Sequence, residues 1–435
     1  MPQLSFANLA ICLAIAFGAR LLLGLVPRVR LPGEVVEIVL GIAFGPAVLG
    51  WVKVDEPVKI LAFVGLAFTL FLAGLELDLT RLRGSLLRVA GAAMAMSACL
   101  AIVVAAILSG AGLIDDARLV AVALCATSLG LVVPVTKQGG FEDRRLGQLV
   151  IAGATLGDFG AIIALSLLFS RDAATTSTRI VLLGVFVALI AVVVFAISLG
   201  GRRKRIGEII DRLADTTAQI RIRGVVLLIV AFALLAERTG LETILGCFVA
   251  GAVVGTVDHD AARNHPQFRV KLDAIGFGFL VPIFFVSAGI RFDLRALLDD
   301  SSTLVLVPLF LVALLVVRGL PAALYHGQLA SRRDVVIAGL LQATSLPFIV
   351  TATMIGVEVG ALTAAVAAAF VGAGLLSALI FPVVALTLAG RNEVESVKTA
   401  FGMTMPLPPH DLDTSRPLAT ALHHVAERVV AEPDG

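Results

Sequence analysis

The sequence predicts an all-α polytopic membrane protein with about thirteen transmembrane helices. Hydrophobic residues make up 59% of the 435 residues and charged residues only 15%, whereas a soluble domain carries about 25% charged residues. The mean hydropathy is +1.01. Apolar runs long enough to cross the hydrocarbon core as helices recur along the whole chain, bounded by charged residues, prolines or glycines.

The apolar runs and the charges between them predict an orientation in the membrane. Basic residues concentrate in the connections that follow odd-numbered runs, and Arg202–Arg205 is the densest group. The positive-inside rule then places the N-terminus outside and the C-terminus in the cytoplasm, with the chain spanning the cell inner membrane several times. The expected surroundings are lipid. A net charge of +2 argues neither for nor against nucleic acid, but the sequence contains no basic surface domain that could bind it, so we expect no nucleic-acid partner. The spans are expected near 4–26, 33–50, 57–79, 86–110, 117–137, 147–170, 178–200, 221–238, 241–257, 273–292, 302–325, 334–356 and 361–390.

Three short motifs recur seven spans apart and in the same order. Ala126-Thr-Ser-Leu129 returns as Ala343-Thr-Ser-Leu346, and Ala73-Gly-Leu-Glu-Leu-Asp-Leu79 returns as Ala288-Gly-Ile-Arg-Phe-Asp-Leu294. Leu40-Gly-Ile-Ala-Phe-Gly45 loosely resembles Leu245-Gly-Cys-Phe-Val-Ala250. Because the shift is an odd number of spans, the second copy faces the opposite way, which predicts the inverted-topology repeats of secondary transporters. The expected domains are a transmembrane domain over 1–392, with repeat one at about 4–170, a linker helix at 178–200 and repeat two at about 221–390, and a cytoplasmic tail over 393–435.

One charge stands alone in the middle of an apolar span. Asp158 is the only ionisable residue between Val150 and Leu168, and no basic residue lies three or four positions away. An ionised Asp at the centre of a transmembrane helix costs roughly 3 kcal/mol on insertion scales. We therefore expect a functional role for Asp158, with its charge compensated by another helix, by water or by a bound cation. The alternative is a structural ion pair with an intramembrane base, for which Arg318 and Arg291 are the candidates.

Both copies of the Ala-Thr-Ser-Leu motif are followed by helix breakers, namely Gly130 and Pro134 in one span and Pro347 in the other. Breakers free backbone groups that lipid cannot satisfy, so they are tolerated where they face protein or a wet cavity. We expect two discontinuous helices that cross near the membrane midplane beside Asp158. The alternative is that the hydroxyls bond back to carbonyl groups of their own helices. The hydroxyl residues concerned are Thr127, Ser128, Thr344 and Ser345.

Glu76 and Arg291 occupy matching positions in the second motif pair and carry opposite charges. We expect them to form an ion pair near the outer side, with a structural role. Glu34 and Glu37 begin the second span and are expected at the membrane interface.

The remaining reactive residue types indicate neither an enzyme nor a resident cofactor. The four cysteines all lie in apolar segments and none forms a CxxC motif, which argues against a disulfide or a zinc site. The sequence contains no nucleophile–base constellation. We therefore expect a protein without enzymatic activity and without a cofactor.

Four motifs together resemble a known family. They are Pro32-Gly-Glu-Val-Val-Glu-Ile-Val-Leu-Gly41 with Gly45-Pro46, Phe71-Leu-Ala-Gly-Leu-Glu-Leu-Asp78, Pro282-Ile-Phe-Phe-Val-Ser-Ala-Gly289 and Thr127-Ser-Leu-Gly130. The chain resembles the monovalent cation:proton antiporters of the second superfamily branch, in particular the sodium/proton exchangers, over about residues 4–390. The resemblance implies a homodimer in which a mobile transport core moves as an elevator against an interface scaffold. It also implies that Asp158 binds the cation and the proton and that Arg318 is the basic residue of the facing helix.

The chain departs from the pattern of that family in two places. Many electrogenic members carry a second Asp directly before the binding Asp and others carry Asn or Gln, whereas this chain has Gly157. Potassium-efflux members add a cytoplasmic nucleotide-binding domain, but only 45 residues follow Gly390. A single βαβ unit already needs about 30 residues, so we expect no such domain in this chain.

These observations predict a secondary transporter that exchanges a monovalent cation, Na⁺ or K⁺, for H⁺ and serves pH homeostasis. Low dielectric favours the protonated form of Asp158 and a bound cation favours its ionised form, so the two ligands exclude each other. Oxygens of Thr127 and Ser128 would complete the cation shell. Since Gly157 is uncharged and an arginine does not release its proton, we expect electroneutral exchange. Two alternatives stay open, a sodium-coupled symporter of an organic anion and a membrane sensor without transport.

Overall fold

The computed structural model describes residues 6–25, 32–76, 84–168, 219–257, 266–298 and 301–401, together with six positions between 181 and 190. All regular secondary structure in these ranges is helical. Nine helical stretches there are long and apolar enough to cross a membrane, which confirms the predicted all-α membrane fold. The chain divides into two compact units, Met1–Gly390 and Arg391–Gly435, and all nine stretches belong to the first.

The helices follow the predicted spans closely. Spans 117–137, 273–292, 302–325 and 334–356 each consist of more than one helical piece. The span predicted at 33–50 contains a helix of only 12 residues. Most of the predicted linker helix 178–200 lies outside the described residues, as does the tail beyond residue 401, so these boundaries stay predictions. The elements are α1 (Ala7–Leu25), α2 (Gly33–Phe44), α3 (Glu56–Leu75), α4 (Gly84–Gly110), α5 (Ala117–Cys125), α6 (Leu129–Gln138), α7 (Arg145–Leu168), α10 (Ile220–Arg238), α11 (Thr243–Val257), α13 (Pro266–Ile275), the π-helical turn η1 (Gly276–Leu280), α14 (Val281–Ile290), α15 (Leu294–Leu298), α16 (Ser301–Leu314), the π-helical turn η2 (Leu315–Gly319), the 3₁₀ helix η3 (Leu320–Tyr325), α17 (Arg332–Gln342), α18 (Pro347–Glu358) and α19 (Ala364–Phe401).

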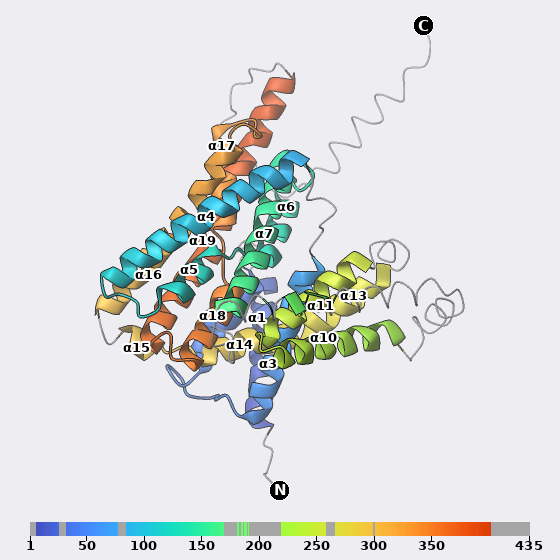
Figure 1. Cartoon of the computed structure of the whole chain (residues 1–435), viewed down its shortest axis with the longest axis vertical. Coiled ribbons are helices and arrows are strands. Elements are labelled where there is room, and N and C mark those ends of the chain that lie inside the picture. Colours follow the sequence, from blue (N-terminus) through green and yellow to red (C-terminus); the bar gives the residue numbers. More distant parts are fainter. Residues whose placement is uncertain are drawn as a thin grey trace. The chain divides into compact units, whose positions relative to one another are not determined.

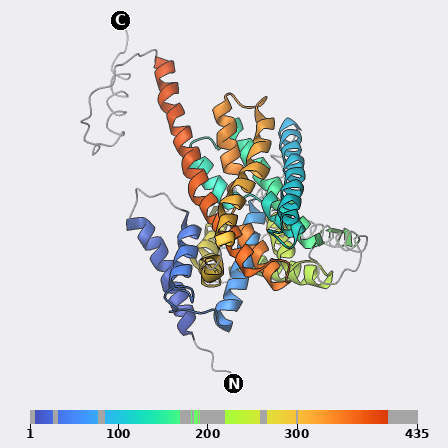
Figure 2. The ribbon, with the colours of Figure 1, turned by 90° about the vertical axis from the view of Figure 1, so that its left-hand side faces the viewer.

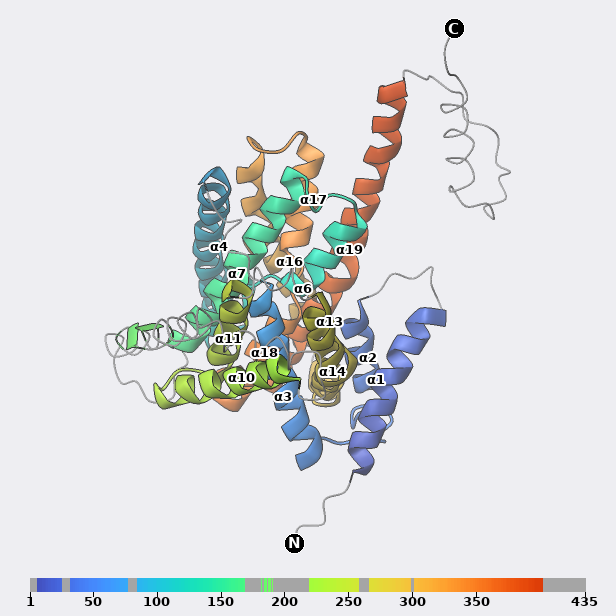
Figure 3. The same cartoon turned by 90° about the vertical axis from the view of Figure 1, so that its right-hand side faces the viewer.

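Most of the helices of the first unit pack in two groups (Figures 1 and 3). In the first helix group, α3 packs against α11 and α14, α2 packs against α14, and α1 lies beside α2 (Figure 2). In the second helix group, α4 packs against α5 and α7, and α17 packs against α7, η2 and η3. Helix α6 packs against α7, and α18 packs against α5. The second group therefore contains Asp158 on α7 and the two spans interrupted at the Ala-Thr-Ser-Leu motifs, α5–α6 and α17–α18, so the candidate site belongs mainly to it.

Glycines allow the close helix contacts of the first group. A Cβ atom at Gly41 of α2 would lie 2.4 Å from the carbonyl oxygen of Val286, and one at Gly289 of α14 would lie 2.2 Å from the carbonyl oxygen of Ile38. The two backbones therefore touch directly. Association through small residues is the packing that transmembrane helices use when lipid gives no hydrophobic drive.

The expected ion pair between Glu76 and Arg291 does not form. The Oε1 atom of Glu76 lies 3.5 Å from Nη2 of Arg269 instead. The span that contains α13 and α14 runs antiparallel to α3, because Arg269 meets Glu76 while Leu280 packs on Gly65. Its 23 residues extend about 34 Å at about 1.5 Å per residue. Arg291 therefore lies at the opposite end of the span from Glu76.

Glu37 is not an exposed carboxylate. Its side chain is fully buried, and Oε1 lies 3.0 Å from Nε of Arg20 on α1. Helix α1 packs against α2, so the carboxylate is in the interior and paired, while its depth in the membrane stays a prediction.

Candidate functional site

The first interruption lies between α5 and α6. Helix α5 ends at Cys125, and Ala126 and Ser128 both have extended backbone, with ψ of 152° and 98°. Ser128 is the N-cap of α6, and its Oγ accepts a hydrogen bond from the backbone N–H of Leu131 at 3.4 Å. A serine N-cap of this kind satisfies one of the backbone donors that a helix start leaves unpaired.

The second interruption lies between α17 and α18 and crosses the first. Residues 344–346 are not helical, and α18 begins at Pro347. The backbone N–H of Ser128 donates to the carbonyl oxygen of Thr344 at 2.9 Å. The hydroxyl of Thr127 donates to the carbonyl oxygen of Gln342 at 2.7 Å. Each interruption thus satisfies backbone groups that the other has freed, as membrane interiors require.

Asp158 lies at this crossing, on α7. Its side chain is buried, and the residue is 8% exposed. Oδ1 accepts a hydrogen bond from the backbone N–H of Thr127 at 3.1 Å, and Oδ2 accepts one from the backbone N–H of Leu129 at 3.2 Å. The carboxylate therefore faces the N-terminus of α6, where unpaired N–H groups and the helix dipole stabilise negative charge.

Arg318 lies on the other side of Thr127, in the π-helical turn η2, and is 1% exposed. Its Nε donates to Oγ1 of Thr127 at 2.7 Å, and Nη2 donates to the carbonyl oxygen of Gly153 at 3.0 Å. Nη1 lies 3.3 Å from Oγ of Ser97 and 3.4 Å from Sδ of Met94. Within the described ranges no salt bridge joins Arg318 to a carboxylate, so the alternative of a direct ion pair with Asp158 is not realised here.

Gly157 is in contact with the same guanidinium. A Cβ atom at this position would lie 2.6 Å from Nη2 of Arg318 and 3.2 Å from the carbonyl oxygen of Cys125. The position before Asp158 therefore has no room for a carboxylate side chain while Arg318 keeps this conformation.

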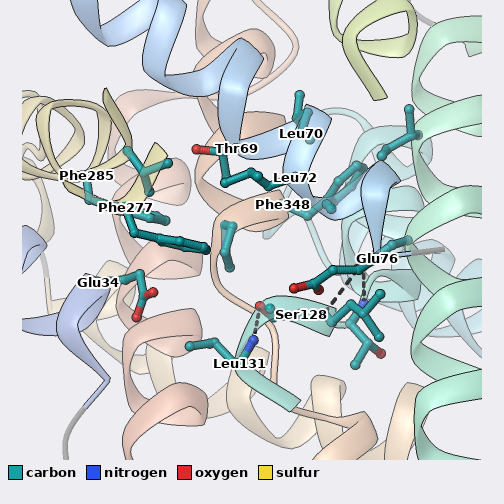
Figure 4. Close-up of a pocket in the computed structure, with 18 residues that line it drawn as sticks. Glu34, Thr69, Leu70, Leu72, Glu76, Ser128, Leu131, Phe277, Phe285 and Phe348 are labelled. Atoms are coloured by element: carbon teal, nitrogen blue, oxygen red, sulfur yellow. Dashed lines mark hydrogen bonds between the residues drawn. The ribbon is translucent and has the colours of Figure 1, made fainter. Parts of the chain in front are cut away.

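Asp158 opens onto a cavity of about 70 Å³ between the two helix groups (Figure 4). Ser128 and Leu131 form part of one wall, and Phe277 and Phe285 form part of the other. Glu76 and Glu34 also line the cavity and bring two further carboxylates to it from the first helix group. Oε1 of Glu76 faces Arg269, and its Oε2 is buried and has no hydrogen-bond partner among the described residues.

The hydroxyl residues of the second interruption do not reach Asp158 through their side chains. Oγ1 of Thr344 bonds back to the carbonyl oxygen of Leu340 at 3.1 Å, which is the alternative expected for such hydroxyls. The backbone N–H of Ser345 donates to Oγ of Ser377 at 3.2 Å, and Oγ of Ser345 has no hydrogen-bond partner among the described residues. The second interruption contributes backbone carbonyls to the crossing instead.

Several residues of the site carry no clear signal in the sequence. Gln342 directly precedes the second Ala-Thr-Ser-Leu motif, and its carbonyl receives the Thr127 hydroxyl. Its side-chain Nε2 donates to the hydroxyl of Tyr325, 17 residues earlier in the chain. For Gln342 the one signal in the sequence of a role at the site is its position beside the motif, and for Ser97 and Met94 the sequence contains no such signal.

Comparisons with known proteins agree with this architecture. The family model described as sodium/hydrogen exchanger, transmembrane, matches residues 13–388. The putative Na(+)/H(+) antiporter YjbQ of Bacillus subtilis is 28% identical over 428 residues, which cover 94% of this chain and 68% of that protein. The Na(+)/H(+)-K(+) antiporter GerN of Bacillus cereus is 29% identical over 276 residues, which cover 61% of this chain and 67% of that protein.

A solved structure shares the fold. The sodium proton antiporter MjNhaP1 of Methanocaldococcus jannaschii superposes with a TM-score of 0.61 at 15% identity, and the match covers 88% of this chain and 98% of that one. Because the family model spans most of the membrane part, the resemblance seen in the sequence motifs is confirmed. The chain belongs to the transmembrane sodium/hydrogen exchanger family.

Proposed function

We propose that this protein exchanges a monovalent cation, Na⁺ or K⁺, for H⁺ at a single carboxylate, Asp158. The observation that supports this most is the setting of that carboxylate, which is buried, faces the start of a half-helix and opens onto a cavity. Burial favours the protonated form, while the two N–H donors and a bound cation favour the ionised form. Proton and cation then compete for one group, which is the minimum that antiport requires.

The related antiporters support both candidate cations. Proteins similar to this chain are named Na(+)/H(+) antiporters, and GerN is named a Na(+)/H(+)-K(+) antiporter. Oxygens at the crossing, including Ser128 Oγ and backbone carbonyls, would complete the shell around the cation. Glu76, whose buried Oε2 has no partner in the part of the chain that the structure describes, would draw cations into the cavity.

We propose one proton per cation and hence electroneutral exchange. Gly157 supplies no second carboxylate, and Arg318 fills the adjacent space with a charge that does not titrate. The carrier then has the same net charge whether it holds H⁺ or a monovalent cation.

We propose an elevator-type cycle in a homodimer. The cavity lies between the two helix groups, so a displacement of the second group against the first would carry Asp158 from one side to the other. The first group, with the exposed apolar side chains of α1 such as Phe17 and Leu21, would form the dimer scaffold in the lipid bilayer. We further propose the cell inner membrane with the N-terminus outside, a transport domain over 1–392 and a cytoplasmic tail over 393–435.

The test is exchange in proteoliposomes. Cation-driven pH change is measured in NaCl, KCl and choline chloride for the wild type, for Asp158→Asn and for Asp115→Asn, a matched variant at an exposed position. We expect activity in Na⁺ or K⁺ that Asp158→Asn abolishes and Asp115→Asn leaves unchanged. Retained exchange in Asp158→Asn would exclude this site, and sodium-driven uptake of an organic anion would favour the symporter. Absence of flux in every salt would favour a sensor.

Stoichiometry is tested in the same vesicles with the membrane potential clamped by potassium and valinomycin, using Na⁺ as the exchanged cation. Electroneutral exchange runs at the same rate at 0 and −100 mV. A rate that follows the potential would contradict one-for-one exchange while leaving Asp158 as the site.

A further inference from the structure

We propose that Arg318 is a positioning residue that acts through Thr127, and that Gly157 is small because the guanidinium needs the space beside it. The inference rests on the proposed function, in which Asp158 is the exchanging carboxylate. It assigns to Arg318 a role other than charge partner of Asp158.

The contacts of Arg318 support this assignment. Among the described residues the guanidinium has four polar contacts, all with uncharged groups, namely two hydroxyls, one thioether and one backbone carbonyl. The shortest, at 2.7 Å, is with Oγ1 of Thr127. A guanidinium that served as charge partner would have its N–H donors directed at the carboxylate, in the fork geometry that arginine and carboxylate share.

Thr127 connects Arg318 to both parts of the crossing. Its hydroxyl accepts from Arg318 and donates to the carbonyl oxygen of Gln342, and its backbone N–H donates to Asp158. The hydroxyl proton is thereby committed to Gln342 and one of the two lone pairs to Arg318, which leaves a single lone pair for any further partner. Through these contacts Thr127 fixes the backbone segment that holds the carboxylate.

Gly157 completes the arrangement. The Nη2 atom lies 2.6 Å from the position of a Cβ at Gly157, closer than side chains tolerate. Even an alanine would require the guanidinium to shift from this position, and we expect the shift to weaken its hydrogen bond to Thr127. Gly160, one turn later on α7, differs, because a Cβ there would meet only Cε of Met94 at 3.4 Å. Gly160→Ala is therefore a matched control for the change from glycine to alanine in this helix.

The experiment is a double-mutant cycle on Arg318→Met and Thr127→Val, with the half-saturating Na⁺ concentration and the maximal rate measured separately in proteoliposomes. Each single variant should raise the half-saturating concentration about tenfold, the effect expected from losing one charge-assisted hydrogen bond. Because Arg318 acts through Thr127, the double variant should be no worse than either single variant. Thr127→Ser, which keeps the hydroxyl, should restore values near wild type.

Arg318→Lys separates the two roles. A lysine keeps the charge but lacks the planar fork that holds Thr127 and Gly153 together, so it should behave like Arg318→Met. Gly157→Ala should resemble these variants, while Gly160→Ala should exchange like the wild type. Only variants that elute as monodisperse protein in detergent are compared.

The proposal is overturned if Arg318→Lys retains wild-type affinity, or if the effects of Arg318→Met and Thr127→Val add. Either result would assign Arg318 to charge compensation. Both outcomes require a wild-type protein that exchanges cations for protons. If the proposed function were wrong, the wild type itself would show no cation-driven flux.

Discussion

Ser128 donates its backbone N–H to the carbonyl oxygen of Thr344 across 2.9 Å, which joins the two interrupted helices directly through their backbones. These residues are the third and second of their Ala-Thr-Ser-Leu motifs, so the sequence repeat meets itself at the crossing. Loss of this hydrogen bond would leave a donor and an acceptor unsatisfied in a region without bulk water, which costs about 1–3 kcal/mol per buried group.

Ser128→Pro removes the N–H at a φ of −85°, which is about 20° from the central value of proline. We expect the variant to unfold in detergent at a markedly lower temperature than the wild type and to exchange more slowly. Ser128→Ala, which keeps the N–H and loses the hydroxyl that caps α6, should lower the free energy of unfolding by about 1 kcal/mol. Equal losses of unfolding free energy in Ser128→Pro and Ser128→Ala would show that the backbone hydrogen bond contributes little to stability.

Glu76 offers a second prediction, on cation affinity. Its carboxylate lines the cavity, and one of its oxygens pairs with the half-exposed Arg269. Glu76→Gln keeps the shape and removes the charge, so we expect the half-saturating Na⁺ concentration to rise about threefold at an unchanged maximal rate. Glu56→Gln, at a side chain that is 72% exposed, serves as control. Complete loss of exchange would instead make Glu76 part of the transport step.

A third prediction concerns movement between the helix groups. Phe159 of α7 and Phe248 of α11 have ring centroids 5.9 Å apart. A second contact joins α7 to the start of α11, where Oγ of Ser166 accepts a hydrogen bond from the N–H of Glu242 at 3.1 Å. A short bis-thiosulfonate linker between cysteines at 159 and 248, in an active background without the four native cysteines, should stop exchange. Reduction should restore it.

The matched control for that linker is a stacked pair that does not bridge α7 and α11. The rings of Phe310 on α16 and Phe370 on α19 stack with centroids 4.5 Å apart, and a displacement of α7 against α11 does not require these two rings to separate. Linking positions 310 and 370 should leave exchange intact. Undiminished transport with 159 and 248 linked would contradict a displacement of α7 against α11.

A fourth prediction uses pH and a carboxylate outside the membrane spans. Burial alone would raise the pKa of Asp116, but hydrogen bonds from the Arg118 side chain and from the backbone N–H groups of Arg118 and Leu119 outweigh it and lower this pKa. A carboxylate with a lowered pKa stabilises the fold above its unfolded pKa of about 3.9, and the stabilisation is lost as the pH falls through the folded value.

Asp116→Ala should therefore lower the free energy of unfolding by about 1 kcal/mol at pH 7, as expected for a lost N-cap. The difference from the wild type should shrink below about pH 4. Thermal unfolding in detergent at several pH values measures it, with exposed Asp115→Ala as the comparison. A difference that does not change with pH would mean that the charge of Asp116 is not what stabilises α5.

The local parts of the site were accessible from the sequence. The apolar runs predicted the spans, the breakers beside each Ala-Thr-Ser-Leu motif predicted interrupted helices, and the lone charge at Asp158 marked the carboxylate. Each of these signals lies within one helix. For the same reason the sequence predicted which residues interrupt their helices, but not that Thr344 would contribute its carbonyl and keep its hydroxyl for Leu340.

Partners contributed by other helices were not accessible. Arg269 as the partner of Glu76, Arg20 as the partner of Glu37, and Thr127 as the partner of Arg318 all depend on which helices are neighbours and on their relative direction. Matching positions in inverted repeats suggested Arg291 for Glu76. The inversion itself separates that pair, because it sends equivalent residues to opposite ends of their spans.

The π-helical turn that carries Arg318 has a consequence for tracing this position through other proteins. A turn such as Leu315–Gly319, with hydrogen bonds five residues apart, accommodates one residue more than a regular α-helix does. Relative to a regular α-helix, the residues after the turn are therefore shifted by one position in the sequence. A relative with a regular α-helix in this span would present its base from an alignment column one place removed, and a gap-free comparison would pair Arg318 with the wrong neighbour.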